Sequence, residues 1–479
     1  MDMTRDGMKK RAKGDSASAG AELHTYLTED QELTLVSSDY SLLTDLYQLT
    51  MAVCYAGEGL AEKTASFELF ARRLPTGFGY LIAMGLAQAL DYLEKFRFSS
   101  QQIAALQATG IFDLAPTSFW QLLATGRFTG NVWAVPEGTA VFANQPLLRV
   151  EAPLWQAQLV ETYLLNVLNY QTLIATRAAR MRDVAGAEAI LLEFGTRRAF
   201  SPQASIWAAR AALAGGLDAT SNVLAALKLN RLPSGTMAHA LVMALAATEG
   251  SELDAFTAFH RYFPGAPLLI DTYDTIAAAT QLAAKVQAGE MELAGVRLDS
   301  GDLVALSQKV RSLLPNVPIF ASGDLDEYEI VRLQTAGANI DGYGIGTRLV
   351  TGEPVSGVYK LVEINGIPVM KEALGKFTYP GRKQIFRHLE KGQIQKDCLG
   401  LISDDANGSQ PLMKLVFKEG DRLQPPEPLS EISQRTAQSV TSLPSETRRL
   451  DRPIPLPVEI SPSLQVLTEQ TRRSEGAIN

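Results

Sequence analysis

The second half of the chain repeats one pattern, a short apolar run followed by a helical pattern, and this repeat restricts the possible folds more than any other feature. The apolar runs cover residues 189–194, 268–271, 295–299, 318–322 and 339–344. Four of them end at Asp271, Asp299, Ser322 and Gly344. Successive ends are 28, 23 and 22 residues apart, the length of a strand, a short loop and a helix. The repeat predicts an α/β fold whose parallel sheet forms an irregular, TIM-like barrel.

The patterns on either side of this repeat divide the chain into further segments. Residues 39–150 mix helical and strand patterns and predict the first part of an α/β satellite domain. The barrel domain is expected over 151–356. Residues 357–424 begin with alternating apolar residues around the turn Asn365-Gly366, which predicts a hairpin that returns to the satellite domain.

The two ends of the chain differ in composition from the rest. Residues 1–38 are rich in charged and small residues and are expected to form a disordered tail. Residues 425–479 are rich in proline and are expected to wrap around the protein, with one helix near 463–473.

Charge and cysteine content exclude several classes of protein. The chain has 44 Lys and Arg against 52 Asp and Glu, a net charge of −8, which argues against nucleic acid or anionic membranes as partners. Two cysteines and four scattered histidines form neither a disulfide framework nor a zinc motif. No apolar run of about 18 residues and no signal peptide is found, so we expect a cytoplasmic protein.

Glycine-rich loops follow two of the predicted strands. Gly342-Tyr-Gly-Ile-Gly-Thr347 contains Gly344 and Gly346, and Ser322-Gly323 ends the preceding strand. Glycines in such loops let backbone N–H groups approach a phosphate. The alternative for the first loop is a tight turn that requires positive φ.

Charged residues follow the strand that ends at Asp299. Arg297 suits an anionic carboxylate, whereas Asp299 and Asp302 suit Mg²⁺ or ribose hydroxyls. The alternative is an ion-paired strand end without chemistry. The loop Asp271-Thr-Tyr-Asp274 is equally consistent with a helix N-cap.

Two adjacent arginines, Arg197 and Arg198, follow the first strand of the repeat. Phosphate is their natural partner. The alternative is that one of them pairs with a structural carboxylate such as Glu193.

Two further residues have possible roles. His239 is expected one turn into an apolar helix, after a Gly-Thr loop, and is either structural or a nucleophile or base. Tyr47 lies on an amphipathic helix, where its ring either packs or stacks on a planar ligand.

Six blocks occur in order along the chain: Thr44-Asp-Leu-Tyr-Gln-Leu-Thr-Met51, Glu193-Phe-Gly-Thr-Arg-Arg198, Ser234-Gly-Thr-Met-Ala-His239, Val296-Arg-Leu-Asp-Ser-Gly-Asp302, Gly344-Ile-Gly-Thr347 and Gly357-Val-Tyr-Lys-Leu-Val362. Together they resemble the nicotinate phosphoribosyltransferase family over about residues 40–470. The resemblance implies a type II phosphoribosyltransferase fold. It also implies synthesis of nicotinate mononucleotide from nicotinate and phosphoribosyl pyrophosphate in NAD salvage, with ATP as co-substrate and Mg²⁺ as cofactor.

The resemblance also assigns roles to individual residues. It implies that ATP phosphorylates His239, that Thr236 and Arg297 bind nicotinate, and that Tyr47 stacks on the ring from the partner subunit of a homodimer. The phosphoribosyl phosphate is implied to lie at the loop of Thr347.

One departure from the family is Ala240, because members often carry serine after the histidine.

Two alternatives to this function remain. One is a nicotinamide-using phosphoribosyltransferase on the same fold, which Arg297 disfavours, and the other is a non-catalytic nucleotide sensor.

Overall fold

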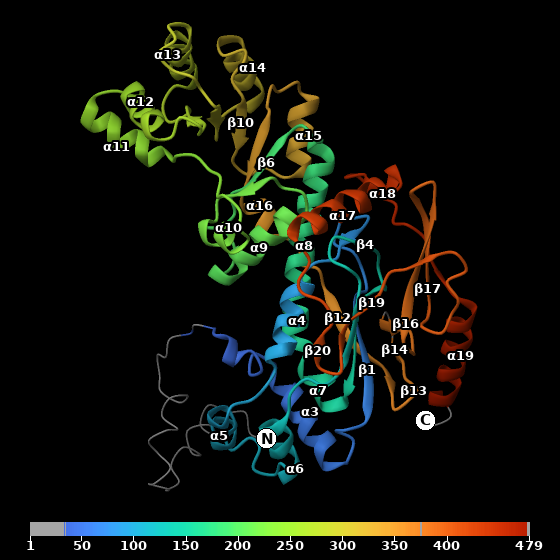
Figure 1. Cartoon of the computed structure of the whole chain (residues 1–479). Coiled ribbons are helices and arrows are strands. Elements are labelled where there is room, and N and C mark those ends of the chain that lie inside the picture. The colour runs from blue at the N-terminus through green and yellow to red at the C-terminus, as the bar shows by residue number, and fades with distance from the viewer. Residues whose placement is uncertain (1–32, 34, 374–375, 477–479) are drawn as a thin grey trace, which may run out of the picture.

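The computed structural model describes residues 33, 35–373 and 376–476. Figure 1 shows α11–α15 gathered around β6 and β10 at one end of the molecule, and α3, α5 and α6 near the opposite end. The long helix α8 (Glu161–Ala185) runs between these two parts. Most of the predicted tail, 1–38, falls outside the described residues, and its described end leads into the 3-10 helix η1 (Ser37–Asp39).

The predicted βα repeat is confirmed as a six-stranded sheet with parallel pairing throughout. Its order is β7 (Ala219–Thr220), β6 (Ile190–Glu193), β11 (Gly342–Ile345), β10 (Ile319–Ser322), β9 (Val296–Leu298) and β8 (Leu268–Leu269). The helices of this part are α9 (Pro202–Ala214), α10 (Val223–Lys228), α11 (His239–Glu249), α12 (Glu252–Tyr262), α13 (Thr275–Gln287), α14 (Leu303–Leu313), α15 (Glu327–Thr335) and α16 (Thr347–Val350). In the described residues the hydrogen-bonded pairing ends at β7 and β8, so closure into a barrel is not confirmed.

Three helices of the repeat begin in the same way, with an aspartate at the N-cap. The carboxylates of Asp274, Asp302 and Asp326 accept backbone N–H groups in the first turns of α13, α14 and α15. Such side chains satisfy donors that lack a partner within the helix. The helix-capping alternative for Asp274 is therefore confirmed.

The satellite part is built on an antiparallel sheet of seven strands. Its order is β13 (Ile367–Pro368), β12 (Gly357–Ile364), β1 (Thr64–Ala71), β5 (Pro146–Pro153), β3 (Asn131–Ala134), β19 (Lys414–Lys418) and β20 (Asp421–Arg422). Strands from before and after the parallel sheet therefore share one sheet. The predicted hairpin joins β12 to β13 through Asn365 and Gly366, both at positive φ.

Smaller elements complete this part. They are the sheet of β18 (Gln410–Pro411), β16 (Lys383–Glu390), β17 (Gln393–Leu401) and β21 (Val458–Ile460), and the pairs β2 (Leu81–Ile82) with β4 (Ala140–Val141) and β14 (Lys371–Ala373) with β15 (Lys376–Thr378). The helices are α3 (Leu46–Gly57), α4 (Leu86–Lys95), α5 (Ser100–Ala108), α6 (Thr117–Thr125) and α7 (Leu154–Leu159).

The proline-rich end of the chain contains more helix than its composition suggests. The predicted late helix is confirmed as α19 (Pro462–Gly476), but α17 (Leu429–Thr441) and α18 (Ser445–Arg448) were not predicted. Each of these two begins directly after a proline, Pro428 or Pro444, whose fixed φ suits a helix start. α17 packs against α8 and α9 and so ties the end of the chain to the parallel-sheet part.

Helix α8 is central to the packing because it contacts both parts of the molecule. Small residues on it, Ala175 and Ala178, lie so close to Gly215 at the end of α9 that any larger residue there would clash. No helix in the described ranges combines the length and apolarity of a membrane span.

Candidate active site

A cavity of about 260 Å³ lies against the parallel sheet and brings together residues from all the central strands. Its lining includes Thr236, Arg297 and Gly344, three of the residues predicted to bind ligand. It also includes Phe194, directly after β6, and Phe320 on β10. Aromatic walls around a few convergent polar groups are typical of small-molecule sites.

Arg297 is the charged group of this cavity. One of its Nη atoms donates to the backbone oxygen of Met237 at 2.9 Å, and its guanidinium carbon lies 5.8 Å from the centre of the Phe194 ring. Its Nε atom is buried and has no partner among the residues that the structure describes. Burial lowers the pKa of Arg297, while Asp299 and Asp271 act in the opposite direction. A guanidinium with an unused buried donor is suited to an anionic ligand.

His239 is the first residue of α11 and is half-buried. Its Nδ1 atom lies 3.1 Å from the hydroxyl oxygen of Thr272. The preceding segment is fixed on both sides, because the Thr236 hydroxyl donates to the backbone oxygen of Pro267 and Arg297 binds Met237. The histidine therefore lies beside the cavity with one ring nitrogen engaged.

A chain of hydrogen bonds links three strand ends. The Asp271 carboxylate accepts the backbone N–H of Asp299 and the hydroxyl of Ser300, both at 2.8 Å. The hydroxyl of Ser322 donates to Asp299. Gly323 follows with φ +92°, and a Cβ atom there would clash with the backbone oxygen of Asp299. The alternative of an ion pair at this strand end is wrong, because Arg297 forms no ion pair in the described residues.

The two aspartates predicted as magnesium ligands have different surroundings. Asp302 uses one carboxylate oxygen to cap α14, whereas one oxygen of Asp299 is engaged by Ser322. Within the described residues no three or more His, Cys, Asp or Glu side chains form a metal-binding group. Mg²⁺ commonly binds through one or two carboxylates together with substrate phosphates, and the free oxygens of this pair fit that type of binding.

The glycines of the loop 342–347 are not explained by a tight turn. Gly342, Gly344 and Gly346 all have negative φ, so the turn alternative is wrong. A Cβ at Gly344 would lie 2.5 Å from the ring of Phe194. The glycine therefore lets the β11 backbone form a wall of the cavity, and Gly346 leads into Thr347, the first residue of α16.

Arg197 and Arg198 are exposed and form no ion pair in the described residues. The alternative of pairing with Glu193 is wrong. The Glu193 carboxylate is buried and accepts the Thr220 hydroxyl and the Gly195 N–H instead.

Tyr47 is not part of this cavity within a single chain. It lies on α3, near the end of the molecule opposite to α11 (Figure 1), and 48% of its surface is exposed. Burial of its hydroxyl and the nearby Glu161 carboxylate raise the pKa of Tyr47.

A group of four cations, which shares the neighbour Glu161 with Tyr47, was not predicted from the sequence. Burial lowers the pKa of Lys360, and the positive charges of Arg72, Lys371 and Lys376 lower it further, while Glu161 acts in the opposite direction. None of these four cations has an ion pair in the described part of the chain. Because three of them lie on different strands, only the fold brings them together.

Phe194 and Thr272 were also missed. Phe194 lies between charged residues in the Glu193–Arg198 block, and Thr272 lies in the loop that contains the helix cap Asp274.

Family models match most of the chain. The nicotinate phosphoribosyltransferase N-terminal domain matches residues 42–169, the nicotinate phosphoribosyltransferase family matches 190–378, and the C-terminal domain matches 401–468.

Individual relatives agree with these matches. The chain is 40% identical to nicotinate phosphoribosyltransferase pncB2 of Mycobacterium tuberculosis, over 86% of this chain and 89% of that protein. It is 39% identical to the nicotinate phosphoribosyltransferase of Bacillus subtilis, over 88% of this chain and 93% of the relative. The crystal structure of human nicotinic acid phosphoribosyltransferase superposes with a TM-score of 0.77 at 32% identity, covering 89% of this chain and 99% of the human one. The chain therefore belongs to the nicotinate phosphoribosyltransferase family.

Proposed function

We propose that this protein is an enzyme that forms nicotinate mononucleotide and pyrophosphate from nicotinate and phosphoribosyl pyrophosphate, coupled to ATP hydrolysis, in NAD salvage. The observation that carries the proposal is the cavity in which Arg297, Thr236 and Phe194 meet. A guanidinium beside an aromatic ring suits a planar aromatic carboxylate. We place the reaction in the cytoplasm, as the sequence led us to expect.

The chemistry requires orientation more than proton transfer. Arg297 holds the nicotinate carboxylate, and the pyridine nitrogen attacks the anomeric carbon of the ribose. The bond from that carbon to the pyrophosphate oxygen breaks, and pyrophosphate leaves with the electron pair. Fixing two reactants in this geometry supplies a large part of the rate enhancement.

The phosphates of phosphoribosyl pyrophosphate are assigned to the loops around the cavity. Backbone N–H groups at Gly344, Gly346 and Thr347, and at Ser322 and Gly323, bind the 5′-phosphate side, and Arg197 and Arg198 neutralise charge. Neither arginine forms an ion pair with another described residue, which supports this assignment. Asp299 and Asp302 would hold Mg²⁺, which neutralises charge on the leaving pyrophosphate.

His239 accepts the γ-phosphoryl group of ATP. With Nδ1 beside Thr272, Nε2 is the ring nitrogen left free to attack. The bond between the γ-phosphorus and its bridging oxygen breaks, ADP leaves, and water later releases phosphate from the histidine. This cycle adds and removes negative charge beside the cavity and so changes its affinity for polyanions.

The working form is a homodimer with shared active sites. Tyr47 is exposed and distant from the cavity of its own chain, and Glu161 is a common neighbour of Tyr47 and Lys360. The surface of Tyr47 and the four cations therefore supplies a ring and positive charge to the partner's cavity. At a nicotinate concentration too low for Arg297→Gln to turn over, mixing this variant with inactive Tyr47→Ala should restore up to about a quarter of the activity, since one site in a mixed dimer is intact. No recovery after subunit exchange contradicts shared sites.

Nucleotide formation from nicotinate and phosphoribosyl pyrophosphate, with and without ATP, tests the function directly. Competition between nicotinate and nicotinamide at equal concentration tests the base, and preferential use of nicotinamide would replace the proposal with its nearest alternative. Incubation with ATP labelled at the γ-phosphate should give an acid-labile label that His239→Ala loses. A non-catalytic sensor would show neither nucleotide formation nor the label.

A further inference from the structure

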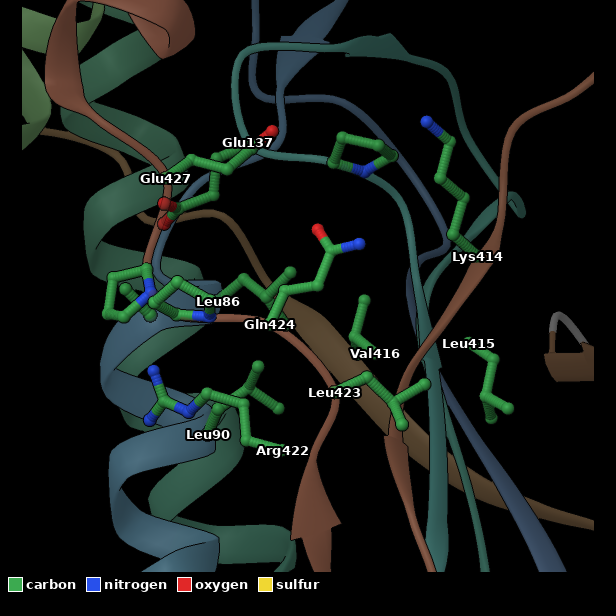
Figure 2. Close-up of a pocket in the computed structure, with 14 residues that line it drawn as sticks. Leu86, Leu90, Glu137, Lys414, Leu415, Val416, Arg422, Leu423, Gln424 and Glu427 are labelled. Carbon is green, nitrogen blue, oxygen red and sulfur yellow. The ribbon is translucent and has the colours of Figure 1, made fainter.

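A second cavity, of about 200 Å³, lies in the satellite part and shares no lining residue with the candidate active site. It is enclosed by α4, by Pro136 and Glu137, by β19, and by the segment 422–427 that leads towards α17 (Figure 2). Nothing in the proposed reaction uses these residues.

The floor of this cavity is apolar. Leu86 and Leu90 from α4 face Val416 from β19 and Leu423 from the covering segment (Figure 2). Cavities of about 150 Å³ with aliphatic and aromatic walls accept a ligand the size of benzene. The space therefore suits a body of one six-membered ring or a branched aliphatic chain.

Three of the four charged lining residues are already neutralised. Arg210 binds both carboxylate oxygens of Glu137, at 3.0 and 2.6 Å. Arg435 binds both oxygens of Glu427, at 2.8 and 2.6 Å, and Arg422 binds both oxygens of Glu94, at 3.0 and 2.9 Å.

These pairs also hold the rim in place before any ligand binds. Although burial acts to raise it, Arg210 and the backbone N–H of Gly85 keep the pKa of Glu137 below its ordinary value. Arg435 also donates to the backbone oxygen of Glu137, so the loop and α17 are fixed together. A fixed rim reduces the ordering cost of binding.

Lys414 is the remaining charge. Within the part of the chain that the structure describes, its side chain has no ion pair or hydrogen bond, although it lines the cavity across from Leu86 and Leu90 (Figure 2). We infer that this cavity binds a small organic monoanion, with its carboxylate at Lys414 and its apolar body among Leu86, Leu90, Val416 and Leu423.

The covering segment provides a way in. Leu423 donates its backbone N–H to Val416, but Pro425, Pro426 and Pro428 have no N–H to donate. The first residue of the segment, Arg422, belongs to β20 and pairs with Glu94, so that end of the segment is fixed. Residues 424–427 are held mainly by the Glu427–Arg435 pair and can open without disrupting the sheet.

Calorimetric titration of the full-length protein with cyclohexanecarboxylate tests the inference. The probe is aliphatic, so it does not mimic the aromatic base of the proposed reaction. We expect saturable binding that Lys414→Gln weakens about tenfold, because it removes the charged partner. Leu86→Trp, which fills the cavity, should abolish binding. The neutral cyclohexanecarboxamide cannot pair with Lys414. Its affinity for the wild type should therefore equal the weakened affinity of the carboxylate for Lys414→Gln.

Two matched variants separate this site from other surfaces. Lys418→Gln removes an exposed lysine from the same strand outside the cavity, and Arg297→Gln removes the cation of the candidate active site. Both should bind the probe like the wild type. Absence of saturable binding, equal binding of the amide, or a loss in Arg297→Gln but not in Lys414→Gln overturns the inference. Lys414 is exposed, so its variant remains informative if Leu86→Trp does not fold.

Discussion

The Nδ1 atom of His239 lies 3.1 Å from the hydroxyl oxygen of Thr272, which follows the edge strand β8. This contact fixes the orientation of an imidazole that otherwise stands at the exposed start of α11. Orienting a nucleophile through its second nitrogen is a common arrangement in catalysis.

Replacing Thr272 should therefore affect the ATP-dependent step more than the base reaction. We expect Thr272→Val to lower the ATP-stimulated rate about five- to tenfold, the loss corresponding to one hydrogen bond, and Thr272→Ser to retain most of it. The measurement is nucleotide formation with and without ATP. An equal loss in both conditions means that Thr272 acts on folding rather than on His239.

Arg297→Gln removes the cation of the active-site cavity while keeping a polar side chain. The KM for nicotinate should rise by about 10- to 100-fold, because a hydrogen bond to a charged group contributes about 1.5–3 kcal/mol. The KM for phosphoribosyl pyrophosphate should change less. An unchanged KM for nicotinate would show that its carboxylate binds elsewhere.

Gly323→Ala forces a side chain into a left-handed backbone position where it also meets the Asp299 carbonyl. We expect the KM for phosphoribosyl pyrophosphate to rise and stability to fall by about 1–3 kcal/mol. Gly392→Ala is the matched control, because Gly392 has φ +81° and no atom of another described residue lies within 4 Å of the added Cβ. It should cost about 1 kcal/mol and leave the KM unchanged. Equal effects of both variants on stability would mean that the clash at Asp299 is relieved.

Glu252, at the start of α12, should make stability pH-dependent. Burial, with Asp271 and Asp274 nearby, raises the pKa of Glu252 to about 7, above its value in the unfolded chain. The folded protein then binds the proton more tightly, so this group's stabilising contribution is present at low pH and is lost as pH rises through about 7. Glu252→Gln should raise the Tm more at pH 8 than at pH 5.5. A Tm difference independent of pH would contradict this.

Two glutamates on α15 differ in burial and allow a direct comparison. Glu327 is buried with Arg180 of α8, whereas Glu329 pairs with the exposed Arg332. Glu327→Gln leaves a buried guanidinium without a counter-charge and should cost about 3–5 kcal/mol in urea unfolding. Glu329→Gln should cost about 0–1 kcal/mol. Similar losses in both would show that Arg180 finds water or another partner.

The local sequence was sufficient for the parallel strands and for the polar residues at their ends. Strand and helix periodicities, together with the aspartate caps of Asp274 and Asp302, are properties of contiguous residues. These patterns also place Arg297, Asp299 and Ser322 close together, because the carboxyl ends of parallel strands lie at one edge of the sheet. The family resemblance supplied the role of His239, which spacing alone left open.

Only the tertiary structure decided which distant residues meet. The contact of Thr272 with His239, the cations around Lys360 and the cavity under segment 422–427 each join elements far apart in sequence. The need for a glycine at position 344 likewise depends on the ring of Phe194, which lies at the end of another strand. Side-chain periodicity reports which face of an element is buried, but not which element covers it. Long-range packing makes that choice, and with it the position of every charge that a ligand meets.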